Sequence, residues 1–307
     1  MQTTFLQDDF GAILTAADGE KVAAVATDTI KDLLTAHGTI LFKGFNTSLE
    51  EFDVLTDRVG TDYMNYKGGG YIRKTTGEES GKTMLSTSTT IEKGQVKPMT
   101  IGLPLHAEMF YTDKRPLLLW FYCVTPCEDG GQTTIADGVA IYRRLPQQWK
   151  DLLAEKRLMY LRAYPDGVWQ NIYQTDDIDA ARAFCHDSGM TTEVDAEGTL
   201  HTTYLASAIP QTRWGGHTAY INSAMTVVMQ ENTARESLSR IRLEDGERLP
   251  AEMVKAVQQI QSELIIELNW EPGDFVLLDN SRTMHGRRAF QDTRREVLLR
   301  MVRDVEF

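Results

Sequence analysis

The strongest constraint on the fold of this 307-residue chain is the residue pattern close to its C-terminus. Residues 264–290 (LIIELNWEPGDFVLLDNSRTMHGRRAF) and 295–302 (REVLLRMV) alternate β-branched or aromatic side chains with polar ones. A period of two is typical of strands that bury one face. Pro272–Gly273 and Asp279–Asn280 supply turn residues between the strands. This part of the chain therefore predicts an antiparallel β core.

The first half of the chain adds further strands and several helices. Residues 114–138 (KRPLLLWFYCVTPCEDGGQTTIADG) predict an apolar strand, a Gly-Gly turn and a second strand, which is the pattern of a hairpin. Apolar residues at helical spacing in 21–37 precede a short β-rich run at 38–45. Residues 143–158 and 226–265 also contain helical patterns, which we expect to cover the core from outside. The predicted fold class is mainly β with flanking helices.

One domain is expected to span residues 1–307, because all-β domains of this length commonly bury a single core. No internal repeat and no Pro-rich or Gly/Ser-rich linker divides the sequence. Helical and loop insertions at 60–100 and 160–220 are expected to line a substrate pocket. The Gly-rich stretch 68–74 does not supply the G-x-x-x-x-G-K-[ST] pattern of a phosphate-binding Walker A loop, so it predicts an exposed loop.

Charge and hydropathy exclude several classes of partner. The chain holds 32 basic and 44 acidic residues, a net charge of -12, with no basic cluster that could neutralise nucleic-acid phosphates. Nowhere do 18 apolar residues run together, and the first residues lack a signal-peptide pattern, so no membrane association and a cytoplasmic location are expected. The three cysteines predict reduced thiols and no disulfide framework.

A possible metal site begins with His106 and Glu108 in the segment LPLHAEMFY. On a strand, residues two apart point to the same face. His285 lies at the end of a β-rich run far along the chain and offers a third ligand. Two histidines and one carboxylate leave open positions on a metal, as non-haem Fe(II) oxygenases require, whereas zinc prefers a nearly closed tetrahedral set. Because an H-x-E triplet is common by chance, the prediction depends on all three residues together.

These segments, in this order, resemble the taurine dioxygenase and clavaminate synthase-like superfamily of Fe(II)/2-oxoglutarate oxygenases, nearest the branch of syringomycin-type aspartyl hydroxylases. The resemblance covers the chain from about residue 38 to the C-terminus. It implies a double-stranded β-helix core (a jelly-roll, cupin-like fold). It also implies Fe(II), 2-oxoglutarate as co-substrate, and O₂.

Position by position, the resemblance places Fe(II) on His106, Glu108 and His285. A carboxylate at Glu108 argues against the related halogenases, which leave that position open for chloride. Thr133, in the segment GGQT, matches a threonine whose hydroxyl binds the 2-oxoglutarate carboxylate.

The distal carboxylate of 2-oxoglutarate needs a cation, and a guanidinium fork suits it because it can donate two parallel hydrogen bonds. Arg294, Arg295 and Arg300 are the candidates. If Arg295 points inward, strand alternation sends apolar residues inward with it. If Arg294 does, Glu296 follows it and buries an unpaired carboxylate, which costs several kcal/mol, on the order of 2–7. Arg295 is therefore preferred, although a solvated basic patch remains an alternative for the others.

The resemblance implies oxidation of an unactivated C–H bond, coupled to conversion of 2-oxoglutarate to succinate and CO₂. Hydroxylation is the default outcome, and desaturation, epoxidation or cyclisation are related outcomes. The expected substrate is a small polar molecule, an amino acid or a natural-product intermediate, free or tethered to a carrier protein. Two alternatives are a hydrolase or isomerase that holds Zn or Mn on the same jelly-roll fold, and a binding module without activity.

Overall fold

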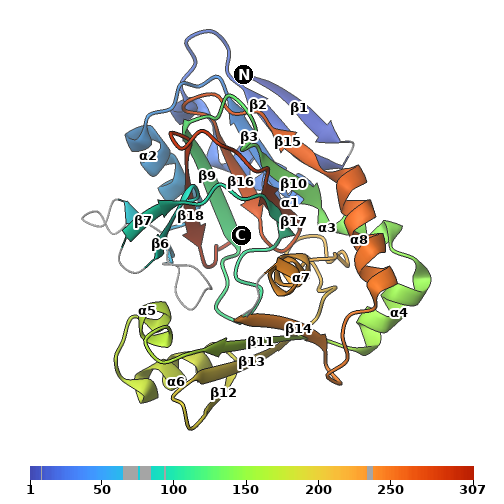
Figure 1. The fold of residues 1–307 in the computed structure, drawn as a ribbon. Helices are drawn as coiled ribbons and strands as arrows, with labels where there is room; N and C mark the ends of the chain where they lie inside the picture. The colour runs from blue at the N-terminus through green and yellow to red at the C-terminus, as the bar shows by residue number, and fades with distance from the viewer. Residues whose placement is uncertain (8, 65–74, 77–83, 93–94, 234–237) are drawn as a thin grey trace.

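A computed structural model describes the chain except residues 8, 65–74, 77–83, 93–94 and 234–237. The Gly-rich loop expected at 68–74, and with it part of the 60–100 insertion, lies outside these residues. Within the described part, the fold is rich in β-sheet and carries helices on its outside (Figure 1). The prediction of a mainly β fold with flanking helices is confirmed at this level.

The largest sheet contains eight of the described strands. Their spatial order is β1 (Gln2–Gln7), β2 (Phe10–Thr15), β3 (Thr39–Lys43), β16 (Phe275–Asp279), β9 (Leu118–Thr125), β18 (Glu296–Val302), β5 (Met84–Ser86) and β4 (Thr75–Thr76). All of these neighbours pair antiparallel except β2 and β3, which are parallel. The C-terminal strand predicted at 295–302 therefore forms, and it lies near the centre of the sheet beside β9.

The two faces of this sheet bury different apolar clusters. Leu298 and Val302 pack with an aromatic cluster that α1 (Thr27–His37) and α2 (Leu49–Val59) cover. The odd-numbered residues from 297 to 301 belong to the other cluster, which the second sheet shares. This alternation is the one that the sequence predicts for the last strand.

Local signals explain where the two covering helices begin and end. The Ser48 side chain accepts a hydrogen bond from the backbone N–H of Glu51, whose carboxylate accepts from the backbone N–H of Ser48. This capping box fixes the start of α2. Gly38 ends α1 with a φ of 69°, a left-handed conformation that favours glycine.

The second sheet has the order β15 (Ile266–Leu268), β10 (Thr133–Asp137), β17 (Thr283–Arg287) and β8 (Leu103–His106). The hairpin predicted for 114–138 is wrong, because β9 and β10 lie in different sheets. Each pairs with strands from the C-terminal part of the chain, and such long-range pairing cannot be recognised in a local pattern. Gly130 is required between them, since a Cβ there would lie 2.2 Å from the Ala289 carbonyl oxygen.

A third sheet covers one end of this β core. Its order is β12 (Thr191–Val194), β13 (Leu200–Ala206), β11 (Leu158–Tyr164) and β14 (Ser239–Leu243). In Figure 1 it lies below the other sheets, with α7 (Ala224–Thr233) between them, and α7 contacts both β8 and β14. The helical prediction for 226–265 is therefore only partly correct, because β14 interrupts it.

The remaining elements are peripheral. They are the short helices η1 (Val22–Ala24), α5 (Trp169–Tyr173) and α6 (Ile178–His186), the helices α3 (Gly138–Arg144), α4 (Gln147–Glu155) and α8 (Ala251–Leu264), and the strand pair β6 (Thr89–Glu92) and β7 (Gln95–Pro98). The helix predicted at 143–158 corresponds to α4, which ends before β11 begins.

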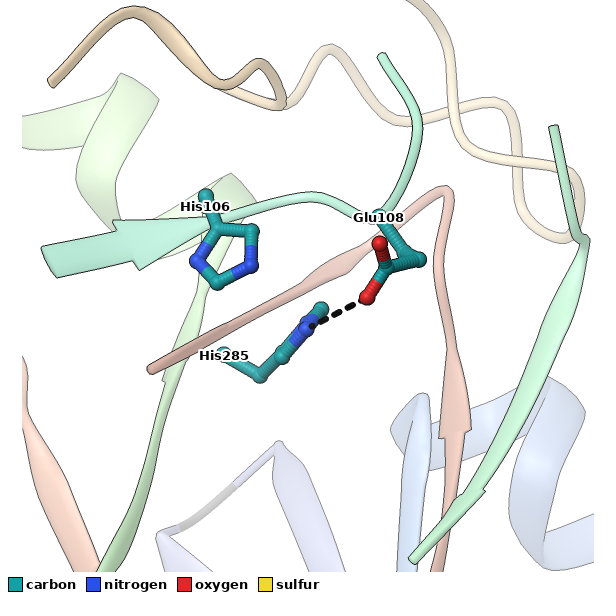
Figure 2. Close-up of side chains that lie close together, drawn as sticks. All are labelled: His106, Glu108 and His285. Carbon is teal, nitrogen blue, oxygen red and sulfur yellow. Dashed lines mark ion pairs between the residues drawn. The ribbon is translucent and has the colours of Figure 1, made fainter. Parts of the chain in front are cut away.

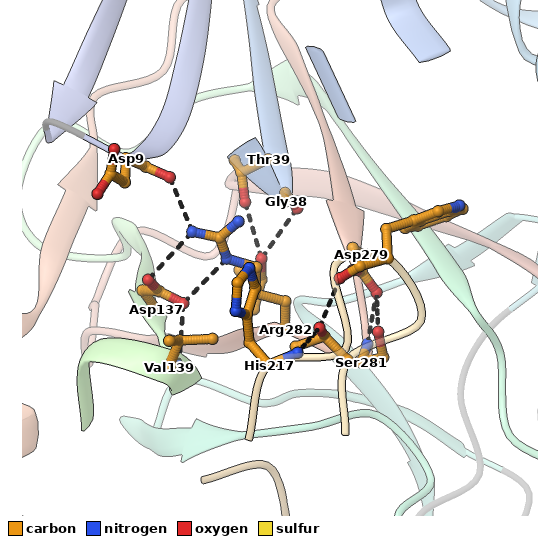
Figure 3. Close-up of polar contacts among 12 residues, drawn as sticks. Asp9, Gly38, Thr39, Asp137, Val139, His217, Asp279, Ser281 and Arg282 are labelled. Carbon is orange, nitrogen blue, oxygen red and sulfur yellow. Dashed lines mark hydrogen bonds and ion pairs between the residues drawn. The ribbon is translucent and has the colours of Figure 1, made fainter. Parts of the chain in front are cut away.

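A buried ion pair joins segments that are far apart in the sequence (Figure 3). Arg282 donates from Nε to Asp137 Oδ1 at 3.2 Å, and its other nitrogens donate to the carbonyl oxygens of Asp9 and Ala36. Asp137 also accepts from the backbone N–H of Val139 at the start of α3. Arg282 thereby holds together the N-terminal strands, α1, β10 and the start of β17. It lies three residues before His285 in the sequence.

The nearby Asp279 carboxyl should make stability depend on pH. Asp279 is 1% exposed, and burial raises its pKa from 3.8 to about 6. Between these two pKa values the folded protein keeps a proton on Asp279 that the unfolded chain releases. The contribution of Asp279 to the free energy of unfolding therefore falls as the pH rises from about 3.8 to about 6. We expect Asp279→Asn to gain stability relative to wild type from pH 3.5 to 7, on the order of 2–3 kcal/mol, in urea unfolding at each pH.

Asp292→Asn is the matched control for this measurement. Arg294 holds the pKa of Asp292 below its usual range through a hydrogen bond at the surface. Asp292→Asn should therefore lose a little stability relative to wild type as the pH rises, the opposite sign. A difference between Asp279→Asn and wild type that stays constant with pH would contradict the interpretation of Asp279.

Candidate active site

His106 and His285 meet because their strands pair. His106 ends β8, and it is the register partner of His285 in β17. The expectation that Glu108 continues the same strand is wrong, because β8 stops at His106. The next backbone N–H, that of Ala107, donates to the carbonyl oxygen of Asn222, which turns the chain out of the sheet.

Asn280 fixes the position of Glu108 through the backbone. Its Oδ1 accepts from the Glu108 N–H at 2.8 Å, and its Nδ2 donates to the Glu108 carbonyl at 3.0 Å and to the Pro116 carbonyl at 2.8 Å. Asn280 is 1% exposed, so these bonds are shielded from water. The sequence pattern identifies Asn280 only as a turn residue. Its side-chain role has no local signal, because its partners lie more than 160 residues away.

The three side chains His106, Glu108 and His285 converge (Figure 2). One candidate ligand atom from each lies within 4.8 Å of the others, and His285 Nε2 lies 3.5 Å from Glu108 Oε2. His106 Nδ1 lies 2.9 Å from the Pro104 carbonyl oxygen, so this nitrogen donates its hydrogen there and Nε2 keeps a lone pair. Two imidazoles and one carboxylate at this spacing fit a divalent metal ion, and they remain the predicted ligands.

A small cavity adjoins this cluster and contains Arg295 and Thr133. Arg295 is 1% exposed, donates from Nε to the Gly131 carbonyl at 2.7 Å, and donates from Nη1 to the hydroxyls of Ser88 and Thr87. Burial lowers the pKa of Arg295 to about 10, so it stays protonated at neutral pH. In the described residues it forms no ion pair, and a buried cation of this kind suits an anionic ligand.

The other arginine candidates lie elsewhere. Arg294 is exposed and bonds Asp292, so it lies away from the cavity. Arg300 is buried on the opposite face of the large sheet, where it pairs with Asp53. Arg287 also lines the cavity, and the sequence analysis did not single it out. It lies two residues after His285, so strand alternation could have identified it.

The Thr133 hydroxyl has a defined orientation. Thr133 is 3% exposed, and the Trp270 indole donates to its Oγ1 at 3.0 Å. An indole N–H can only donate, so the hydroxyl accepts this bond and its own hydrogen remains for another acceptor. Since Thr133 lines the cavity that contains Arg295, this hydrogen is available to a ligand there.

Comparison with known proteins identifies the class. The family model described as "Taurine catabolism dioxygenase TauD, TfdA family" matches residues 2–302. A clavaminate synthase-like protein of Arabidopsis thaliana is 27% identical over 293 residues, covering 88% of this chain and 85% of that protein. The dapdiamide synthesis protein DdaC of Enterobacter agglomerans is 25% identical over 283 residues, covering 86% and 82%. The chain belongs to the TauD/TfdA dioxygenase family.

Solved structures share the fold. PvcB of Pseudomonas aeruginosa superposes with a TM-score of 0.58 at 17% identity, covering 96% of this chain and 86% of that one. AAD-2, solved with Mn(II) and N-oxalylglycine, superposes with a TM-score of 0.60 at 14% identity, covering 99% of both chains.

Family membership makes the protein a dioxygenase that depends on Fe(II), 2-oxoglutarate and O₂, as the sequence analysis predicted. It does not favour the hydrolase or isomerase alternative. Among the described residues, no helix is both long and apolar enough to cross a membrane. Cys123, Cys127 and Cys185 form no disulfide, which agrees with the prediction of free thiols.

The Asn280 contacts lead to a prediction about metal affinity. Asn280→Ala removes the bonds that fix the Glu108 backbone, so Glu108 should lose its orientation toward the two histidines. We expect metal affinity to fall about 10–100-fold, the usual effect of removing a group that orients a ligand. Calorimetric titration of the metal-free protein with Mn(II) measures it.

Ser281→Ala is the matched control, because Ser281 bonds Asp279 and not Glu108. Ser281→Ala should leave Mn(II) affinity within about twofold of wild type, a much smaller change than the loss expected when a group that orients a ligand is removed. Thermal unfolding of both variants tests that each remains folded. If folded Asn280→Ala binds Mn(II) as tightly as wild type does, the Asn280 side-chain hydrogen bonds (the Asn280 clamp) do not position a metal ligand.

Proposed function

We propose that this protein oxidises an unactivated C–H bond of a small polar substrate, with His106, Glu108 and His285 holding Fe(II). The convergence of these three side chains, within 4.8 Å of one another in a family that uses Fe(II), carries the proposal. We also propose that residues 1–307 form one domain, and that the eight-stranded sheet and the sheet of β15, β10, β17 and β8 form a double-stranded β-helix. The long-range pairing of β9, β10, β16 and β17 supports this.

The cavity with Arg295 and Thr133 is proposed to bind 2-oxoglutarate. The Arg295 guanidinium can donate to its distal carboxylate, and the Thr133 hydroxyl can donate its remaining hydrogen to the same group. When bound, Fe(II) would allow O₂ to act as the oxidant, with one oxygen atom used to convert 2-oxoglutarate to succinate and CO₂ and the other available to oxidise the substrate. The protein's own residues orient 2-oxoglutarate and the substrate and shield the site from water.

The relatives support a role in biosynthesis. DdaC is named as a dapdiamide synthesis protein, and another relative, from Streptomyces avermitilis, is named pentalenolactone F synthase. We propose that the substrate is an amino acid or a natural-product intermediate, free or tethered to a carrier protein. Hydroxylation is the proposed outcome, and desaturation, epoxidation and cyclisation are the related ones. The aspartyl hydroxylase branch remains part of this proposal.

Removing a proposed ligand tests the reaction class. His106→Ala or Glu108→Ala should reduce succinate formation from 2-oxoglutarate to background in the presence of Fe(II), because two ligands hold the metal too weakly. Both variants should stay folded, because the side chains line a cavity and do not fill the apolar core. His201→Ala, which removes a surface histidine that bonds Asp195, is the control and should retain activity. Wild-type protein without Fe(II)-dependent succinate formation, or global unfolding of both variants, would count against the proposal.

Paired arginine variants test the 2-oxoglutarate site. Arg295→Ala should raise the KM for 2-oxoglutarate about 10–100-fold, since a hydrogen bond to a charged group contributes about 1.5–3 kcal/mol. Arg294→Ala should leave this KM almost unchanged, because Arg294 lies in solvent beside Asp292. Steady-state kinetics with varied 2-oxoglutarate measures both. The reverse ranking would move the assignment away from Arg295.

A further inference from the structure

A second cavity meets the same His106 and Glu108 side chains from the direction of the third sheet. His106, Glu108 and Leu103 line both cavities, whereas Thr133 and Arg295 line only the first. The second cavity is walled by α7, β8, β11 and β14, and apolar atoms, including those of Met99, Met109 and Val227, make up most of its exposed surface. A molecule in this cavity would lie beside the proposed metal without occupying the 2-oxoglutarate cavity.

A cation, Arg162, lies in this lining on the inward face of β11. Strand alternation places Arg162 on the same face as the other even-numbered residues from 158 to 164, which are apolar or aromatic and buried. Its register partners are Thr202 on β13 and Ser239 on β14, which are 3% and 8% exposed. These three residues make one polar row across an otherwise apolar face, and Arg162 and Ser239 line the cavity.

The Arg162 side chain is held in one orientation. Its guanidinium lies over the Tyr111 ring, 3.6 Å from the ring centroid, and its Nη1 donates to the Tyr164 hydroxyl at 2.9 Å. Stacking on an aromatic ring fixes the plane of a guanidinium, and its five N–H groups lie in that plane, so one arginine can bond several partners at once. Such a preorganised fork matches the two oxygens of a carboxylate better than it matches a neutral group.

A second polar group in the same lining also indicates a ligand. Thr226 on α7 lines the cavity, and its hydroxyl oxygen is buried and has no hydrogen-bond partner among the described residues. Leaving a buried hydroxyl without a partner costs about 1–3 kcal/mol, so such groups commonly mark a place where a ligand or water binds.

We infer that Arg162, with Thr226 and Ser239, forms the binding site for a carboxylate of the substrate. This inference rests on the proposed function and makes its substrate class narrower: a free carboxylic acid, with its reacting carbon held near His106 and Glu108. A substrate tethered to a carrier protein through that carboxyl carbon would lack the charge that this site recognises.

The probes are the proteinogenic L-amino acids, each compared with its primary amide. Full-length protein with Mn(II) and 2-oxoglutarate is heated with each probe, and the probes that raise its melting temperature are titrated by calorimetry. We expect one or more acids to bind at least about tenfold more tightly than their amides, because a charge-assisted bond contributes about 1.5–3 kcal/mol. Binding of the acids and amides that does not differ, or no binding by any acid, would overturn the inference.

Three variants separate recognition from structural support. Arg162→Gln should weaken binding of the acid about 10–100-fold and remove its advantage over the amide, whereas Arg162→Lys should keep part of that advantage. Arg294→Gln carries the same charge change at the surface and should bind the acid as wild type does. If Arg162→Gln is unstable, the comparison of Arg162→Lys with wild type decides. An unchanged acid-to-amide ratio in Arg162→Lys and Arg162→Gln would assign Arg162 a structural role alone.

A separate measurement distinguishes failure of this inference from failure of the proposed function. Wild-type protein with Fe(II), O₂ and ascorbate as reductant should convert 2-oxoglutarate slowly to succinate without substrate, and the surface variant Arg294→Gln should do so at the same rate. Absence of this conversion in wild type contradicts the proposed function. Conversion in wild type together with equal binding of acids and amides contradicts only the carboxylate site.

Discussion

The pairing of β8 with β17 is the contact on which the rest of the site depends. It places His106 opposite His285, although 179 positions separate them in the sequence. The clamp from Asn280 then adds Glu108, which β8 itself does not carry. The buried Arg282–Asp137 pair holds the start of β17 against the N-terminal strands and α1. The three proposed ligands are therefore positioned by contacts between distant segments, and a local change in any one segment would displace them.

The buried arginines show how the same side chain serves different purposes. Arg282 and Arg300 each have a carboxylate partner, Asp137 and Asp53, so their charge is compensated within the protein. Arg295 is buried as deeply and has hydroxyl and carbonyl acceptors but no carboxylate within the described residues. A charge that the fold leaves uncompensated is costly, and such groups tend to occur at functional sites. This contrast supports Arg295 as a ligand-binding residue independently of the sequence resemblance.

Sequence patterns predicted those features that depend on strand alternation or on residue type. Alternation correctly placed the odd-numbered residues of 297–301 on the inner face, and residue type selected the three proposed ligands. Patterns failed where partners are distant. The apolar run and Gly-Gly turn of 114–138 resemble a hairpin, but β9 and β10 each pair better with C-terminal strands. The Asn280 clamp and the Trp270–Thr133 bond were missed because no residue near either of them indicates the contact.

Two cavities meet at His106 and Glu108, and they are proposed to bind different molecules, 2-oxoglutarate in the first and the substrate in the second. The first is lined by the Arg295 guanidinium, which can donate to an anion, and by Thr133, whose hydroxyl is oriented by Trp270. Strands of the eight-stranded sheet and of the second sheet build this cavity. The second is covered by α7 and the third sheet, and it contains the stacked Arg162. A co-substrate common to a family needs the same cavity in every member, whereas the substrate differs between members. An inserted sheet can change without disturbing β8 or β17, so specificity is expected to reside in β11, β14 and α7.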